Sequence, residues 1–152
     1  MKFESIDGLL RFAISKEQAA QQFYLELAAQ MTDAVAQRIF RTIARQEEKH
    51  EEALKLEVLK QGYTLSVQET DSAQSARFSW QEQVELDTET INMNYAEALM
   101  VAIQKERASF QLYTQLIGMT QEPDMRKMLL ELAEEEMRHV IQFEREYDAV
   151  SH

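Results

Sequence analysis

Apolar residues recur at spacings of three and four along four long stretches of this sequence, and this periodicity restricts the fold more than any other feature. Such spacing places the apolar side chains on one face of an α-helix. The composition agrees, because the 152 residues include only three Gly and one Pro, which are poor helix formers. We therefore predict an all-α protein that forms a single domain over residues 1–152.

The predicted helices form two pairs. They span about residues 5–30, 33–61, 93–117 and 123–147. Few residues separate the members of each pair, so each pair must fold as an antiparallel hairpin, and the two hairpins as a four-helix bundle. Gly62 is expected to end the second helix and Pro123 to begin the fourth. The long crossover, about residues 62–92, would run along the bundle, and four of its side chains are expected to pack there: Phe78, Trp80, Val84 and Leu86.

Charge and composition exclude several classes of partner and site. A formal net charge of −11 argues against nucleic acid as a partner, because phosphates would repel the chain. No apolar run approaches the roughly 18 residues of a membrane span, and the amphipathic start "MKFESIDGLLRFAISKEQ" lacks the apolar core of a signal peptide. We therefore expect a cytoplasmic protein with no membrane partner. The absence of Cys excludes disulfides, thiolate metal sites and a catalytic thiol.

The apolar stripes of the second and fourth helices each contain a Glu-x-x-His motif. The second stripe reads Phe40, Ile43, Glu47, His50 and Leu54. The fourth reads Leu129, Leu132, Glu136, His139 and Phe143. A carboxylate at a core position lowers stability unless a partner compensates its charge, so we expect a compensating partner for these residues. Four neighbours in the first motif are expected to point away from the core: Glu48, Lys49, Glu51 and Glu52.

The first and third helices each add one Glu to their stripes. The first stripe reads Leu10, Ala13, Glu17, Ala20 and Tyr24. The third reads Leu99, Ala102, Glu106, Ser109 and Tyr113. In both stripes a Tyr follows the Glu by two helical turns. A Tyr on a core stripe is more often a packing residue than a redox group.

These residues are two copies of one pattern. The same offset separates all three pairs of equivalent residues (106 − 17 = 136 − 47 = 139 − 50 = 89). The two hairpins can therefore face each other about a pseudo-twofold axis, which brings four Glu and two His together. Four carboxylates cannot all stay ionised side by side without compensation. Two divalent cations would neutralise them, and carboxylate with imidazole suits iron, manganese or zinc.

The motifs "EQAAQQFY", "EEKH", "ERASFQLY" and "EMRH" resemble those of the rubrerythrin branch of the ferritin-like superfamily. A Glu from each of two helices and a Glu-x-x-His from each of the other two is the ligand set of ferritin-like di-iron proteins. The resemblance covers all four helices and implies six metal ligands: Glu17, Glu47, His50, Glu106, Glu136 and His139. It places Glu47 and Glu136 as bridges between the metals, one His on each metal, and Tyr24 and Tyr113 nearby. Ser109 stands where rubrerythrins typically have a further Glu, so we expect a simpler six-ligand site similar to that of bacterioferritin.

The resemblance also implies a function. It implies two iron ions as cofactors, with manganese or zinc as alternatives. The implied activity is that of an oxidoreductase that reduces hydrogen peroxide or dioxygen, with a role in oxidative stress. Rubrerythrins typically carry a Cys-ligated rubredoxin module, and this sequence contains no Cys. Electrons would therefore come from a separate donor, such as a rubredoxin-like protein.

Two other functions remain open at this point. The chain could handle iron as a ferroxidase or storage protein, with the metal as its substrate. It could also be a non-enzymatic protein whose helices are braced by the metal. The long crossover is compatible with a homodimer, including one in which helices are exchanged between chains.

Overall fold

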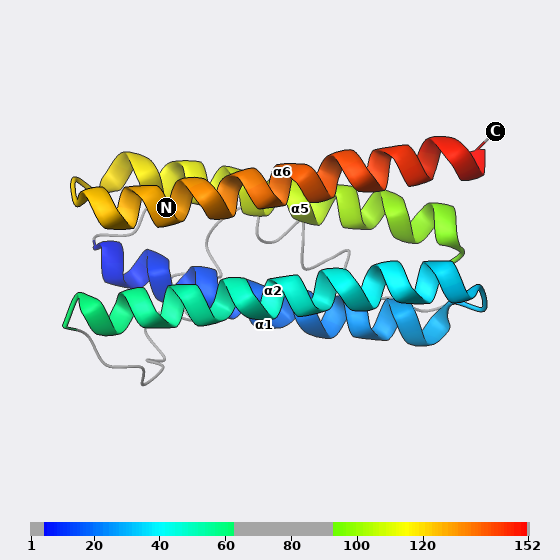
Figure 1. The fold of residues 1–152 in the computed structure, drawn as a ribbon, viewed down its shortest axis with the longest axis horizontal. Helices are drawn as coiled ribbons and strands as arrows, with labels where there is room; N and C mark the ends of the chain where they lie inside the picture. The colour runs from blue at the N-terminus through cyan, green and yellow to red at the C-terminus, as the bar shows by residue number, and fades with distance from the viewer. Residues whose placement is uncertain (1–4, 63–92, 152) are drawn as a thin grey trace.

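The computed structural model describes residues 5–62 and 93–151, and every regular element within them is an α-helix. In chain order these helices are α1 (Ile6–Gln30), α2 (Ala34–Lys60), α5 (Tyr95–Met119) and α6 (Pro123–Ser151). α1 packs against α2 and α5 against α6, as two hairpins lying side by side (Figure 1). The predicted all-α bundle of two hairpins is confirmed. The crossover residues predicted to pack on it, Phe78, Trp80, Val84 and Leu86, lie outside the described residues.

The helix ends differ from the predicted ones by up to four residues. α5 begins after Asn94, because the Asn94 side chain accepts the Glu97 amide (2.8 Å) and the Glu97 side chain accepts the Asn94 amide (3.0 Å). Gly62 follows the end of α2 with a φ of +86°, a left-handed conformation that favours glycine. α6 begins at Pro123, as predicted, and continues to Ser151 rather than to about residue 147.

The apolar core is divided into two clusters. One contains Leu9, Ile14, Leu54, Leu112 and Ala133 among its buried members. The other contains Ala20, Ala44, Ala102, Phe40 and Phe143 among its buried members. On each helix the two clusters leave a short stretch between them, and the stripe glutamates occupy this stretch. The fold therefore places the polar stripe residues at the middle of the bundle, with packed apolar side chains at both ends.

Among the described residues, no helix is both long and apolar enough to cross a membrane.

Candidate metal centre

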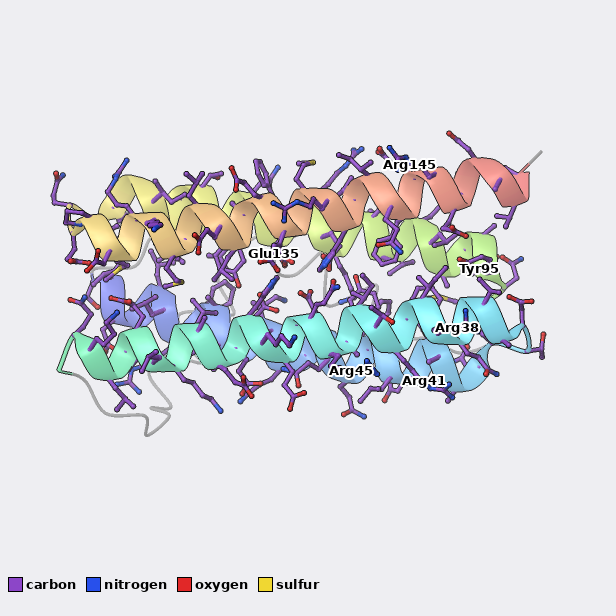
Figure 2. All side chains as sticks on the ribbon, in the orientation of Figure 1. Arg38, Arg41, Arg45, Tyr95, Glu135 and Arg145 are labelled. Carbon is purple, nitrogen blue, oxygen red and sulfur yellow. The ribbon has the colours of Figure 1, made fainter. Side chains whose placement is uncertain are left out.

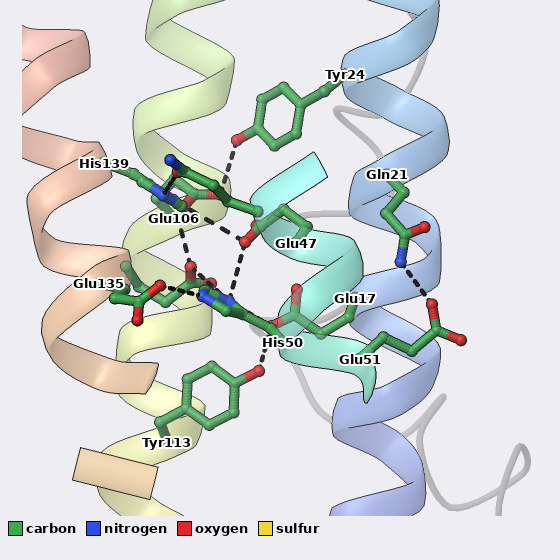
Figure 3. A network of polar contacts seen from close by, with 12 residues as sticks. Glu17, Gln21, Tyr24, Glu47, His50, Glu51, Glu106, Tyr113, Glu135 and His139 are labelled. Atoms are coloured by element: carbon green, nitrogen blue, oxygen red, sulfur yellow. Dashed lines mark hydrogen bonds and ion pairs between the residues drawn. The ribbon is translucent and has the colours of Figure 1, made fainter. Parts of the chain in front are cut away.

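Six polar side chains from the four helices meet at the middle of the bundle (Figure 3). Each helix contributes the stripe residues that the sequence analysis singled out, and all six are at least 96% buried: Glu17, Glu47, His50, Glu106, Glu136 and His139. Because helical spacing puts them on the core-facing stripe, the packing of the two end clusters removes them from water. Their predicted role as metal ligands remains a prediction.

The six side chains form two overlapping groups that could each hold a metal ion. The first group is Glu17, Glu47, His50 and Glu136; the second is Glu47, Glu106, Glu136 and His139. In each group the potential ligand atoms lie within 4.8 Å of one another. Glu47 and Glu136 belong to both groups. This arrangement is consistent with a dinuclear site in which two carboxylates face both metal positions.

Among the described residues, several of the buried atoms have no hydrogen-bond partner. These atoms are both carboxylate oxygens of Glu47 and of Glu136, Oε1 of Glu17 and Nδ1 of His50. The closest contact of His50 Nδ1 in this cluster is Glu47 Oε1, at 3.1 Å. Unpaired buried carboxylate oxygens are costly, and cations are the partners that would satisfy them all at once. The donor set therefore fits two divalent metal ions.

The pKa values of the cluster also indicate a site that positive charge would stabilise. Burial, and then repulsion from the other carboxylates, holds the pKa of Glu47 and of Glu136 well above its ordinary value. Burial also raises the pKa of Glu17. Burial alone would lower the pKa of His50, but the contacts with Glu17 and Glu47 outweigh it and raise the pKa. Without cations, the cluster therefore retains protons that metal ions would displace.

Glu106 differs from the other three carboxylates. Its burial raises its pKa, but contact with His139 outweighs this effect and leaves the pKa below its ordinary value. Glu106 Oε1 lies 2.6 Å from His139 Nδ1, the nitrogen that faces the cluster. This ion pair therefore joins two potential ligands of the second group, Glu106 and His139, directly to each other.

Two tyrosines link the hairpins across the centre. The Tyr24 hydroxyl of α1 donates to Glu106 Oε2 of α5 (2.8 Å), and the Tyr113 hydroxyl of α5 donates to Glu17 Oε2 of α1. Burial and the nearby carboxylates raise both tyrosine pKa values well above 10.0, so both hydroxyls keep their protons. Each tyrosine therefore orients the glutamate of the opposite hairpin.

The outer ring nitrogens of the histidines contact two residues at equivalent positions in the repeat. His50 Nε2 lies 2.8 Å from Glu135 Oε1, and His139 Nε2 lies 2.5 Å from Gln46 Oε1. Neither Glu135 nor Gln46 is among the site residues predicted from the sequence. The repeat could have identified both residues, since the 89-residue offset maps Gln46 onto Glu135 and each residue lies four positions before its helix's histidine.

Glu51 departs from the expectation that it points away from the core. It is only 8% exposed, and it accepts hydrogen bonds from Gln18 (2.7 Å) and Gln21 (2.6 Å) of α1. Lys55 pairs with it at 2.7 Å. Burial raises the pKa of Glu51, but these partners outweigh burial and lower it. Glu51 therefore stays ionised at the α1–α2 seam, beside the centre rather than in it.

Among the described residues, the two seams between the hairpins give different access to the centre. Between α1 and α5, small residues such as Ala20 and Ser109 line a cavity of about 10 Å³ next to Glu106. Between α2 and α6, a groove of about 470 Å³ reaches His139. Two cationic side chains, Lys49 of α2 and Arg138 of α6, are among the residues that line this groove. Figure 2 labels four other exposed arginines of the same two helices: Arg38, Arg41, Arg45 and Arg145. The wider approach to the histidines is therefore the α2–α6 side.

The bundle and the two overlapping Glu/His groups define the class: a ferritin-like four-helix protein with a site suited to two metal ions. The family model described as Rubrerythrin matches residues 8–147, so the chain belongs to the rubrerythrin family. A comparison with curated proteins gave no significant match.

Three solved structures are similar to this chain. A dodecameric thioferritin, the bacterioferritin-related protein of Bacteroides fragilis, has a TM-score of 0.81 at 15% identity, over 99% of this chain and 89% of that one. The manganese catalase KatB of Anabaena has a TM-score of 0.74 at 15% identity, over 99% and 76%. A hypothetical protein of Pyrococcus furiosus has a TM-score of 0.72 at 19% identity, over 95% and 89%. These likenesses confirm the predicted ferritin-like fold.

Proposed function

We propose that this protein binds two iron ions and acts as an oxidoreductase that reduces hydrogen peroxide or dioxygen. The observation that carries the proposal is the set of unpaired oxygens on Glu47 and Glu136, which belong to both groups. Two bound ferrous ions would supply the two electrons that, with two protons, convert one hydrogen peroxide into two water molecules. Membership of the rubrerythrin family supports iron over other metals.

Three pairs of residues would hold the two metals. Glu47 and Glu136 would bridge the two positions, because each has both oxygens free of hydrogen bonds. His50 and His139 would each present Nδ1 to one position, since their Nε2 atoms face Glu135 and Gln46 instead. Two further carboxylates would complete the positions, one on each: Glu17, oriented by Tyr113, and Glu106, oriented by Tyr24.

Electrons would return to the centre from a donor outside these 152 residues, which contain no Cys for a rubredoxin-type module. A rubredoxin-like donor fits this need. The chain would also self-associate, most simply as a homodimer, with or without exchange of helices. The dodecameric state named for the thioferritin supports self-association, and sedimentation over a range of concentrations would measure it.

The first test is metal analysis of protein purified without added metal, followed by addition of peroxide to the anaerobic ferrous protein. We expect about two iron ions per chain and the rapid appearance of near-ultraviolet absorption, with two ferrous ions oxidised per peroxide. Glu136→Gln should lower the iron content, whereas Glu134→Gln, on an exposed position of the same helix, should not. Tightly held zinc with no response to peroxide would overturn the proposal.

Two further outcomes would assign a different function. Uptake of many more than two iron ions per chain would make iron the substrate, as in a ferroxidase or storage protein. Evolution of dioxygen from peroxide without any reductant would indicate catalase chemistry, which the similarity in fold to a manganese catalase makes worth measuring.

A further inference from the structure

The 89-residue repeat matches the six potential ligands, but it does not match the residues that contact the outer ring nitrogens (Nε2) of the histidines. The partner of His50 Nε2 is the Glu135 carboxylate (2.8 Å), and the partner of His139 Nε2 is the Gln46 side-chain amide (2.5 Å). The two cationic side chains that line the groove beside these residues do follow the repeat, since Lys49 corresponds to Arg138. The main difference in charge behind the two histidines is therefore one carboxylate against one neutral amide.

This difference acts on the ring nitrogens that face the metal positions. A neutral imidazole that binds metal through Nδ1 carries its proton on Nε2 and donates it outward. A carboxylate that accepts this proton makes the imidazole a stronger ligand and adds negative charge near the metal, whereas an amide oxygen only fixes the ring. The Glu135 side chain is 43% exposed, so solvent weakens its field but not its direct contact with the ring.

We propose that the two metal positions are inequivalent, and that the position at His50 binds a divalent metal first because Glu135 supports its histidine. This inference rests on the proposed two-metal centre. Glu135 and Gln46 are positioning residues in this account, since each acts through a histidine and not on the metal itself. Outer partners of ligating histidines typically change metal affinity by about 10- to 100-fold, so we expect the two positions to differ by about tenfold or more.

The test resolves the two histidines separately. Metal-free protein labelled with ¹⁵N in its histidine rings would be titrated with Zn²⁺, a diamagnetic probe, and followed by ¹H–¹⁵N correlation spectra. A His139→Gln variant would assign the ring signals. We expect the His50 signals to convert to their bound form ahead of those of His139, and the ratio of the two populations at one equivalent measures the difference in affinity. Isothermal titration calorimetry would give the affinities of both steps.

Exchange of the two outer partners supplies the decisive variant. Gln46→Glu combined with Glu135→Gln keeps the net charge and the composition, and it should reverse the order in which the two histidines bind Zn²⁺. Glu135→Gln alone should weaken binding at the His50 position by about 10- to 100-fold. Glu134→Gln removes the same charge from an exposed position of α6 and should leave the order and both affinities unchanged.

The outcomes separate this inference from the proposed function. If both histidines convert in parallel in the unaltered protein, or if the exchanged variant keeps the original order, the inequivalence is wrong and the two-metal centre stands. If Glu134→Gln weakens the first step as much as Glu135→Gln, the contact with His50 is not the cause. If neither histidine signal responds and calorimetry shows no binding, the two-metal centre itself fails.

Discussion

The middle of the bundle and its two ends are built from the same four helices, yet their contributions to stability have opposite signs. At the ends, side chains such as Phe143 and Leu54 are fully buried among apolar neighbours. In the middle, the equally buried Glu47 and Glu136 accept no hydrogen bond on any carboxylate oxygen from the part of the chain that the structure describes. The apolar ends therefore supply the stability that holds the polar middle together until cations compensate its negative charge.

The largest effect should come from an apolar end. Phe143 packs against Tyr24 and Phe40, with ring centroids 5.9 Å and 6.1 Å away. Phe143→Ala should lower the free energy of unfolding by about 3–5 kcal/mol, measured by urea denaturation, with and without metal. Leu130→Ala, at a side chain that is 51% exposed, is the control and should change it by less than about 0.5 kcal/mol. Equal effects of the two variants would contradict the burial of Phe143 in an apolar end cluster.

Removal of metal should have the next largest effect, and it should act only through the middle. A metal at about 100 times its dissociation constant stabilises the folded state by about 2.7 kcal/mol. We therefore expect a clear drop in melting temperature when a chelator is added, and a much smaller drop in Glu47→Ala. If metal-free and metal-loaded protein melt at the same temperature, the six residues do not form a metal centre.

The metal-free protein should become less stable as the pH rises from about 5 to 8. Glu47 and Glu136 have folded-state pKa values above 4.5, and His50 and His139 above 6.5. The folded state thus binds more protons than the unfolded state in this range, so the free energy of unfolding falls as pH rises. The slope is about 1.4 kcal/mol per pH unit for each proton of difference. Glu106, with its lowered pKa, opposes this only below about pH 4.5.

Urea titrations of chelated protein at several pH values would measure this slope. Metal ions displace the retained protons, so the metal-loaded protein should lose this dependence or reverse it. A metal-free protein that gains stability between about pH 5 and 8 would contradict the arrangement of charges described for the middle.

Glu136→Gln should stabilise the metal-free protein at about pH 8 by roughly 1 kcal/mol, because it removes a buried carboxylate that accepts no hydrogen bond from the described residues. The same substitution should reduce the stabilisation by metal. Thermal melts with and without chelator would show both effects, with the exposed Glu134→Gln as the matched control. Destabilisation of the metal-free protein by Glu136→Gln would mean that the carboxylate has a stabilising partner after all.

The smallest effect should come from a tyrosine at the border between the middle and an end. Tyr24→Phe keeps the ring in its aromatic cluster but removes the hydrogen bond to Glu106. We expect a loss of about 0.5–1.5 kcal/mol in the free energy of unfolding. Leu99→Ala, a cavity-forming control in the same apolar cluster, should cost about 2–5 kcal/mol. A Tyr24→Phe loss as large as that of Leu99→Ala would contradict this modest contribution of the hydroxyl, because the substitution leaves the ring in place.

Helical periodicity predicted the bundle, the hairpins and the meeting of the six polar side chains, because a stripe residue at the centre of a buried face is buried at any packing angle. Glu51 and Gln46 lie at the two edges of the α2 stripe, towards α1 and towards α6. Their burial and contacts depend on how closely the neighbouring helices approach, which spacing within one helix does not determine. This is why Glu51 was wrongly expected to point away and Gln46 was not identified, while helix ends shifted with local caps such as Asn94.

The reciprocal tyrosine contacts make each hairpin depend on the other. Because Tyr24 supports the glutamate of the second hairpin and Tyr113 that of the first, each hairpin carries what its counterpart needs. Two identical copies of one hairpin, related by a true twofold axis, would therefore assemble four Glu, two His and both hydrogen bonds. The centre is thus a property of the interface between the hairpins, and neither hairpin alone contains all of it.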